Sequence, residues 1–307
     1  MNFGRRLFEG GDPFIFVHDG VSYIYCTTEN SRPLEAANAF DTDVDGRDGI
    51  YVYRLSERGE WERVGLCLDG RDAVGERWFW APEVYFYKGR FYMLFSSEEY
   101  PEIAVADSPT GPFKSLTGKR LRDEKSIDGH LLFDGDKVYL YYVRLDCGNR
   151  IFVAEMSDDL THITAEYDEP LIVASDPWET VDCSVAEGPF VLKHGGYYYL
   201  VYSANHTRSP MYAVGYACSE SPTGPFIKYD GNPIIKASGD VVGVGHNSFA
   251  AMSDGSLVCA YHCHSKNPDN FKPRMVCLAG AEFVKNDDGA DRLIVHYQNE
   301  VCENETE

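Results

Sequence analysis

One supersecondary pattern recurs five times along this sequence, and it constrains the fold more than any other feature. Each copy is a short apolar strand, a glycine-containing turn and a second apolar strand. The copies begin near residues 12, 82, 128, 187 and 246, so that the last two intervals are both 59 residues. Two near-identical stretches, SPTGPF at 108–113 and 221–226, have the composition of a turn leading into an outer strand. Such internal repetition indicates a repeat architecture.

The repeat predicts an all-β fold. Five hairpins, each followed by room for about two further strands, describe a five-bladed β-propeller, in which four-stranded sheets surround a central channel. Five such units account for the whole chain, so we expect one domain over residues 1–307. Two stacked β-sandwiches would also be all-β, but they would not require five hairpins to start alike.

The five hairpins also begin in a similar way, with a polar or proline-containing corner. The corner residues are Asp12, Pro82-Glu83, Asp128, Glu187 and His246. One such residue is ordinarily a solvated turn residue, but that explanation would have to hold at several corners independently. Because the first strand of each blade lines the channel of a propeller, we expect three carboxylates and a histidine to converge at one mouth.

Three carboxylates around a sugar-sized opening suggest cleavage of glycosidic bonds. That reaction needs one carboxylic acid to protonate the leaving oxygen and one carboxylate to activate water or attack carbon. The acid must remain protonated near neutral pH, which burial and a neighbouring carboxylate both favour. A third carboxylate can tune the pKa of the acid.

Composition restricts the partners. The chain has 28 basic and 49 acidic residues, a formal net charge of −21, which argues against nucleic acid or an anionic membrane as the main partner. It also has 17 Phe, 21 Tyr and 4 Trp, whose faces suit a neutral, hydroxyl-rich ligand such as a carbohydrate. No stretch of about 18 uncharged apolar residues is present.

The N-terminal residues and the cysteines predict the cellular compartment of the protein. The N-terminal stretch MNFGRRLFEGGDPF has no apolar core or cleavage site of a signal peptide, so we expect a cytoplasmic protein. The nine cysteines are odd in number, scattered in spacing and form no CxxC pair, which favours reduced thiols over a disulfide framework.

The hairpin sequences resemble a known enzyme family. GGDPFIF, FWAPEVYFYKGRFYMLFSS, SIDGHLLFDGDKVYLYY, VAEGPFVLKHGGYYYLVYSA and GVGHNSF together are similar to glycoside hydrolase family 43, from about residue 10 to 285 and in the family's order. The resemblance implies a five-bladed propeller and an inverting glycosidase that acts mainly on arabinose- and xylose-containing polysaccharides.

The resemblance also implies roles for individual residues. Asp12 would be the general base, Glu187 the general acid, and Asp128 the group that tunes the acid and orients the sugar. Trp80 would line the sugar pocket, and Arg274 would reach the sugar. His246 would lie on the channel axis, where many members hold a hydrated calcium or another cation; a purely hydrogen-bonding histidine is the alternative.

Two departures from the family's pattern bear on specificity. Gly129 follows the tuning Asp, where proline is common. Many β-xylosidases of the family carry a C-terminal β-sandwich that closes over the pocket, whereas this chain ends about 20 residues after its fifth blade. We therefore expect an α-L-arabinofuranosidase or an arabinan-directed enzyme rather than a β-xylosidase. A partner chain could supply the missing wall; the sequence does not determine the oligomeric state, the sugar or the linkage.

Three other classes of propeller protein are alternatives. A protein-interaction propeller would carry Gly-His and Trp-Asp signatures in each blade, which are absent. A catalytically silent glycan-binding propeller would have a similar sugar site. The retaining fructan hydrolases place their nucleophile in a Trp-Met-Asn-Asp-Pro-Asn type stretch, whereas this chain has Glu-Gly-Gly-Asp-Pro-Phe.

Three further motifs favour structural roles. DTDVDGRD at 41–48 resembles the start of an EF-hand loop, but position 12 would be Val52, so we interpret it as an acidic surface loop. In CAYHCHS at 259–265, cysteines and histidines face opposite sides of a strand, which favours packing over a zinc site. We expect Glu83 to be structural.

Overall fold

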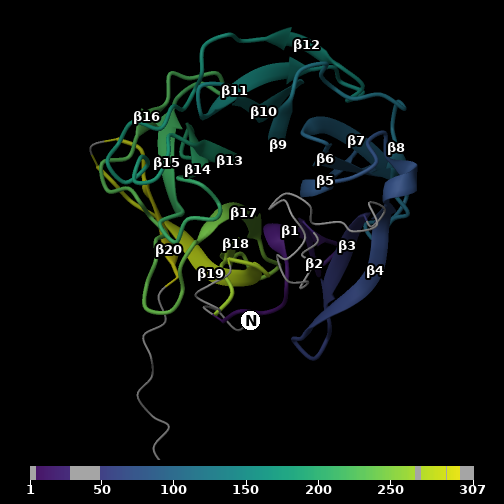
Figure 1. The fold of residues 1–307 in the computed structure, drawn as a ribbon, viewed down its shortest axis with the longest axis horizontal. Helices are drawn as coiled ribbons and strands as arrows, with labels where there is room; N and C mark the ends of the chain where they lie inside the picture. Colours follow the sequence, from purple (N-terminus) through teal and green to yellow (C-terminus); the bar gives the residue numbers. More distant parts are fainter. Residues whose placement is uncertain (1–4, 28–48, 267–270, 288, 298–307) are drawn as a thin grey trace, which may run out of the picture.

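The computed structural model describes residues 5–27, 49–266, 271–287 and 289–297, and these residues form five four-stranded antiparallel sheets around a ring (Figure 1). The first sheet contains β1 (Gly11–His18), β2 (Val21–Thr27), β3 (Gly49–Leu55) and β4 (Trp61–Asp69). The second contains β5 (Trp80–Tyr87), β6 (Arg90–Ser97), β7 (Tyr100–Ala106) and β8 (Lys114–Ser115), and is preceded by a 3₁₀ turn, η1 (Gly70–Asp72).

The other three blades repeat this order. The third contains β9 (Ser126–Asp134), β10 (Lys137–Leu145), β11 (Asn149–Met156) and β12 (Ile163–Glu166). The fourth contains β13 (Ala186–His194), β14 (Tyr197–Ala204), β15 (Ala213–Ser219) and β16 (Ile227–Lys228). The fifth contains β17 (Gly245–Ala251), β18 (Leu257–Cys263), β19 (Met275–Val284) and β20 (Arg292–His296). The predicted five-bladed β-propeller is confirmed.

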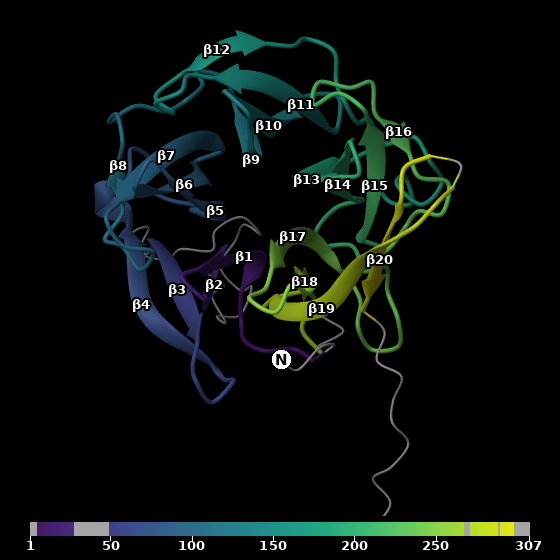
Figure 2. The same cartoon turned by 180° about the vertical axis from the view of Figure 1, so that it is seen from behind.

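The first strand of each blade lies innermost, as both views of the ring show (Figures 1 and 2). Strand β1 contacts both β5 and β17, so the first and last blades meet and the ring is closed. The segment before β1 adds to this closure, because Gly10 N–H donates to the Arg274 carbonyl and Leu7 N–H donates to the Val276 carbonyl, both at 2.9 Å. Ring closure brings residues of the first and last blades to one site.

Each innermost strand contains an irregularity of register at the same place. At each irregularity one residue adopts the left-handed backbone conformation. Its φ is 50° for Asp12, 46° for Ala81, 54° for Asp128, 58° for Gly188 and 49° for His246. Positive φ is uncommon outside glycine, and a bulge re-aims the side chain next to it. The five corners are therefore equivalent, but Glu187 lies one residue before its bulge, and Ala81 takes the place that the sequence suggested for Pro82-Glu83.

Further along the same strands, aromatic side chains fill the channel. The Phe190 ring lies 6.2 Å from Phe14, 4.5 Å from His130 and 5.7 Å from Phe249, measured between ring centroids, and Tyr85 lies 5.6 Å from Phe14. Each of these five rings comes from a different innermost strand. The channel is consequently packed with aromatic side chains below the corners.

The acidic stretch at 41–48 lies outside the described residues. Within the described part of the chain, no helix is long and apolar enough to cross a membrane.

Candidate active site

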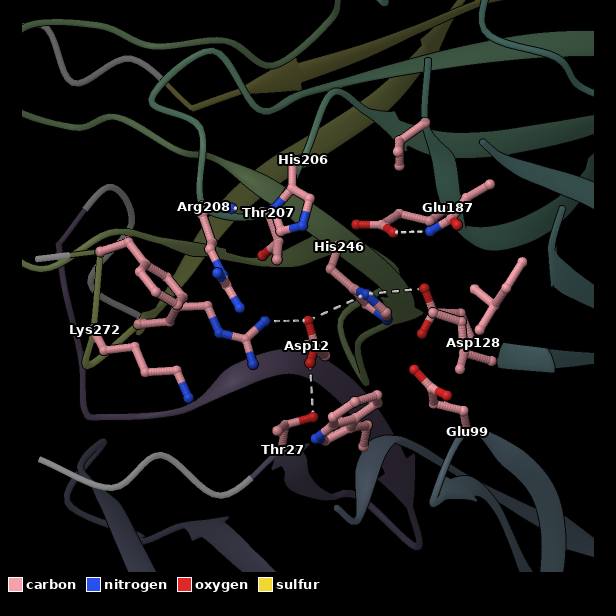
Figure 3. A pocket seen from close by; sticks show the side chains of 17 residues that line it. Asp12, Thr27, Glu99, Asp128, Glu187, His206, Thr207, Arg208, His246 and Lys272 are labelled. Atoms are coloured by element: carbon pink, nitrogen blue, oxygen red, sulfur yellow. Dashed lines mark hydrogen bonds and ion pairs between the residues drawn. The ribbon is translucent and has the colours of Figure 1, made fainter. Parts of the chain in front are cut away.

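A pocket of about 300 Å³ opens at the mouth where the innermost strands begin (Figure 3). All five blades or the loops between them contribute to its wall. The lining residues are Asp12, Thr27, Trp80, Glu99, Ile127, Asp128, Leu145, Asn149, Val185, Glu187, His206, Thr207, Arg208, His246, Phe271, Lys272 and Arg274. The six residues that the sequence assigned to a site are all among them, whereas Glu83 is not.

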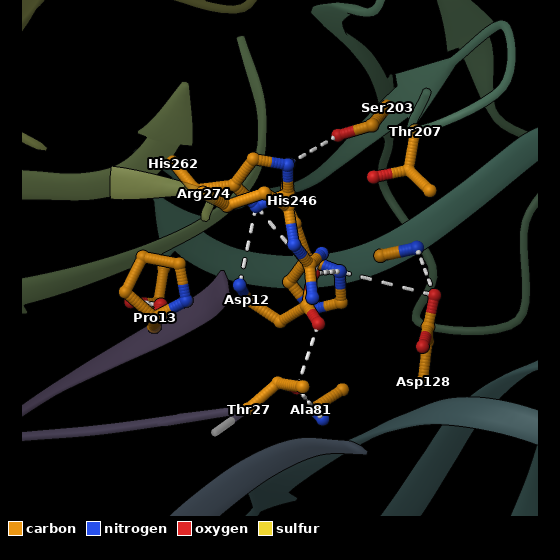
Figure 4. Close-up of polar contacts among 12 residues, drawn as sticks. Asp12, Pro13, Thr27, Ala81, Asp128, Ser203, Thr207, His246, His262 and Arg274 are labelled. Carbon is orange, nitrogen blue, oxygen red and sulfur yellow. Dashed lines mark hydrogen bonds and ion pairs between the residues drawn. The ribbon is translucent and has the colours of Figure 1, made fainter. Parts of the chain in front are cut away.

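Asp12 is held by positive and neutral donors from several strands (Figure 4). Arg274 Nη1 lies 2.6 Å from Oδ1, and the Thr27 hydroxyl donates to Oδ2 at 2.7 Å. The backbone N–H of Asp12 donates to His262 Nδ1 at 3.1 Å. Burial alone would raise the pKa of Asp12, but the charge of Arg274, the two neighbouring histidines and the Thr27 hydrogen bond together hold the pKa below its usual range.

A glycine allows the arginine to reach this aspartate. A Cβ placed on Gly11 would lie 2.1 Å from the Arg274 guanidinium, so a larger side chain there would displace it. Packing therefore explains the glycine that precedes Asp12 in the Gly-Gly-Asp sequence: the guanidinium occupies the space that a side chain at Gly11 would fill.

Asp128 and Glu187 form a buried pair of acids, each 8% exposed. Asp128 Oδ2 accepts a hydrogen bond from the Gly188 backbone N–H at 3.1 Å. Burial, the charge of Glu187 and the charge of Asp12 raise the pKa of Asp128 well above its usual value. Burial also raises the pKa of Glu187, to about 7, although hydrogen bonds from Asn149 and Tyr212 oppose this rise. The pair therefore retains a proton near neutral pH.

His246 lies between Asp12 and Asp128. Its Nδ1 is 3.2 Å from Asp12 Oδ1 and 3.9 Å from Asp128 Oδ2, and its backbone N–H donates to Ser203 Oγ at 2.8 Å. Burial lowers the pKa of His246, so the ring is neutral at neutral pH. Gly188, the equivalent residue of the fourth blade, leaves room for it, because a Cβ there would lie 3.1 Å from Nδ1.

The structure places Glu83 below the pocket. Its carboxylate pairs with His130 Nδ1 at 2.9 Å and accepts a hydrogen bond from the Tyr85 hydroxyl. The histidines of the CAYHCHS stretch also have protein contacts: His262 accepts from the Asp12 backbone, and His264 Nε2 lies 2.7 Å from the Thr207 carbonyl oxygen. His262 thus belongs to the surroundings of the pocket.

Several lining residues were not anticipated from the sequence. Thr27 ends β2, Asn149 begins β11, and the stretches 206–208 and 271–272 are loops. No local pattern distinguishes these residues from ordinary strand ends and turns, because their importance depends on contacts with distant blades. A glycine next to a turn, such as Gly148 beside Asn149, is the one local signal of close packing.

The pocket has the two protonation states that glycosidic hydrolysis needs. Asp12 is held as a carboxylate, while Glu187 keeps its proton to near neutral pH. Trp80 and the apolar side chains of Ile127, Leu145 and Val185 provide surfaces on which a sugar ring can pack.

Comparison with known proteins identifies the same chemistry. Residues 8–289 match the family described as "Glycosyl hydrolases family 43". Among solved structures, an endo-1,4-beta-xylanase from Bacteroides thetaiotaomicron is 33% identical with a TM-score of 0.82, covering 96% of each chain. A thermostable family-43 glycoside hydrolase is 34% identical with a TM-score of 0.80 and the same coverage.

Curated relatives are more distant. An extracellular exo-alpha-(1->5)-L-arabinofuranosidase from Streptomyces avermitilis is 28% identical over 82% of this chain and 54% of its own length. An arabinan endo-1,5-alpha-L-arabinosidase from Aspergillus aculeatus is 26% identical over 66% of this chain and 68% of its own length. The alignment thus spans about half to two thirds of these proteins. The family match over nearly the whole chain, together with the acid-lined pocket, shows that this chain belongs to glycosyl hydrolase family 43.

Proposed function

We propose that this glycoside hydrolase releases single pentoses, α-L-arabinofuranose before β-D-xylose, from short oligosaccharides or side chains. The observation that carries the reaction is the opposite protonation of two buried acids in one pocket: the pKa of Asp12 is lowered and that of Glu187 is raised to about 7. Inversion is general to family 43.

Each acid has one step in this proposal. Glu187 donates its proton to the glycosidic oxygen as the bond to the anomeric carbon breaks, and the leaving group departs as an alcohol. Asp12 accepts a proton from a water molecule, whose oxygen attacks the anomeric carbon from the opposite face. Asp128 is the second member of the buried acid pair: the charge of Glu187 raises the pKa of Asp128, and Asp128 accepts a hydrogen bond from the Gly188 N–H. Its role in this proposal is to tune the acid, because repulsion between two carboxyl groups acts on both. Arg274 keeps Asp12 ionised.

The preference for arabinofuranose is the finer part of the proposal. It is supported by the similarity to the arabinan endo-1,5-alpha-L-arabinosidase and to the exo-alpha-(1->5)-L-arabinofuranosidase. β-D-xylose is the second candidate, because the solved structure with 33% identity is described as a xylanase and a relative from Bacteroides ovatus as a xylosidase/arabinosidase.

A panel of substrates tests the proposal. We expect the purified protein to cleave nitrophenyl α-L-arabinofuranoside faster than nitrophenyl β-D-xyloside, and to release only arabinose from short linear arabinan. Asp12→Ala with unchanged circular dichroism serves as the inactive control. A folded wild-type protein that binds oligosaccharides but cleaves neither pentoside would instead be a glycan-binding propeller.

We also propose that a hydrated calcium or similar cation binds on the channel axis beside His246. The Nδ1 of this neutral ring faces two carboxylates and keeps its proton there, so that Nε2 retains a lone pair for a ligand. The described residues contain no group of three or more His, Cys, Asp or Glu side chains arranged for a metal, so water would supply most of the ligands. The ion would add positive charge near the acids. Elemental analysis, with melting temperatures before and after chelation, tests this; an unchanged melting temperature and no bound metal would refute it.

A further inference from the structure

The side-chain amide of Asn149 is aimed at one oxygen of Glu187. Asn149 Nδ2 donates to Glu187 Oε2 at 2.8 Å. We propose that Asn149 is a positioning residue of this enzyme, which reserves Oε2 as an acceptor and so places the transferable proton on Oε1. This inference rests on the proposed function, in which Glu187 is the general acid.

The third blade is shaped to bring this amide to the fourth. Leu145 and Asn149 are paired across the β10–β11 hairpin, and the turn between them has φ of 48° at Cys147 and 86° at Gly148. A Cβ on Gly148 would lie 2.0 Å from the carbonyl oxygen of Ser184, just before β13. Only a glycine lets the turn lie against this segment, and the close approach puts Asn149 beside Glu187.

The amide acts on the acid without carrying charge. A carboxylic acid has one oxygen that bears the proton and one that mainly accepts, and an amide N–H can only donate. The hydrogen bond to Oε2 therefore favours a proton on Oε1, and it is strongest when the carboxyl group is ionised. Consistent with this, burial raises the pKa of Glu187, while the hydrogen bonds from Asn149 and Tyr212 lower it.

The other groups around Glu187 explain why Asn149 is the informative one to change. Charged or titratable neighbours face the carboxyl group from several elements: Asp12 in β1, Asp128 in β9, Cys183 before β13, Tyr212 before β15 and Arg274 just before β19. Removing any charged neighbour changes both charge and hydrogen bonding. Removing the Asn149 amide changes the hydrogen bonding alone.

The test compares the pH dependence of Asn149→Leu, which removes the donor, with that of the wild-type enzyme. We expect the alkaline limb of kcat/KM to move to higher pH by about one unit, since the ionised acid has lost a stabilising hydrogen bond. We also expect kcat for an alkyl glycoside to fall at least about tenfold, and that for a dinitrophenyl glycoside to fall much less, because a good leaving group needs little protonation. A merely structural role would lower both rates equally and leave the limb in place.

Two further variants keep the test decisive. Arg150→Ala is a control: it breaks the 2.6 Å ion pair with Asp146 in the same hairpin but keeps the Asn149 amide. The alkaline limb of kcat/KM should therefore not move. If Asn149→Leu does not fold, Asn149→Ala removes the donor without adding charge and should move the alkaline limb in the same direction. An unmoved limb in whichever donor-less variant folds would overturn the inference.

The acid assignment is tested separately by Glu187→Ala. Its rate loss should be much larger for alkyl than for dinitrophenyl glycosides. If Glu187→Ala shows this dependence while the Asn149 variants do not move the limb, the proposed function stands and the role of Asn149 is wrong. If Glu187→Ala lowers both rates equally, the proposed function itself fails.

Discussion

Arg274 holds Asp12 in an enclosed ion pair, with Nη1 2.6 Å from Oδ1, although 262 positions separate the two residues. They are 7% and 8% exposed. A carboxylate this deeply buried would be protonated without a compensating charge. The ion pair with Arg274 therefore determines whether Asp12, the base of the proposed reaction, is ionised at neutral pH.

Removing the arginine should affect stability and activity together. We expect Arg274→Met to lower the free energy of unfolding by about 3–5 kcal/mol, because it leaves Asp12 buried without its charge partner. The pKa of Asp12 should rise, so the acidic limb of kcat/KM should move to higher pH. Arg274→Lys keeps the charge and should show a smaller change in both. Urea unfolding at pH 7 and the pH–rate profile measure these effects; an acidic limb that Arg274→Met leaves in place would contradict them.

The stereochemistry of the product tests the role of Asp12. For inversion, the carboxyl groups of Asp12 and Glu187 must leave space for water, which implies a separation of about 6.5–9.5 Å rather than about 5 Å. NMR of the first-formed sugar should show the anomeric configuration opposite to that of the substrate. Asp12→Ala should be inactive, and azide should not restore turnover with retained configuration. A first product with the configuration of the substrate would mean that Asp12 is not acting as a base.

Asp128 should tune the acid by repulsion. Asp128→Asn removes a negative charge near Glu187 while its side-chain oxygen can still accept from the Gly188 N–H. The charge of Glu187 raises the pKa of Asp128. Because repulsion between two carboxyl groups acts on both, its loss should lower the pKa of Glu187, and the alkaline limb of kcat/KM should move to lower pH. This direction is opposite to that expected for Asn149→Leu. A limb that moves upward in Asp128→Asn would show that hydrogen bonding outweighs charge at this site.

Glu187 should also make the fold less stable as the pH rises. Its folded pKa of about 7 exceeds its ordinary value of 4.5, so between these values the folded state binds more protons than the unfolded state and stability decreases with pH. Glu187→Gln cannot ionise, so relative to wild type it should gain stability from pH 4.5 to 8, by at most about 3 kcal/mol.

Glu179 provides a matched control of opposite sign. It is fully buried, donors from Tyr202 and Lys228 lie 2.5 Å from its oxygens, and its pKa is lowered despite burial. Its contribution to stability is present above its unfolded pKa and is lost as the pH falls through the folded value. Glu179→Gln should therefore lose stability at neutral pH. Melting temperatures from about pH 3 to 8 measure both, because the contribution of Glu179 changes only below about pH 4.5; a Glu187→Gln difference that stays constant with pH would refute the assignment.

The sequence by itself determined the blades and most of the acids. Hairpins are encoded locally, by alternating apolar residues and by glycines in the turns, so their fivefold repetition was enough to predict the ring. Because equivalent strand starts meet at one end of a propeller, the convergence of the corner residues Asp12, Asp128, Glu187 and His246 followed from the repeat. The assignment of Trp80 and Arg274 to the same site came from the family resemblance.

Only the tertiary structure decided which way these side chains point and which contacts they make with one another. A bulge shifts a strand by one residue, and one residue changes the face to which a side chain points. Alternation in the sequence therefore could not show that Glu187 lies before its bulge while Gly188 occupies the position equivalent to Asp12. The contact of Asn149 with Glu187 and that of Thr27 with Asp12 were equally hidden, because each depends on the packing of strands after the chain has closed into a ring, and no local pattern records that packing.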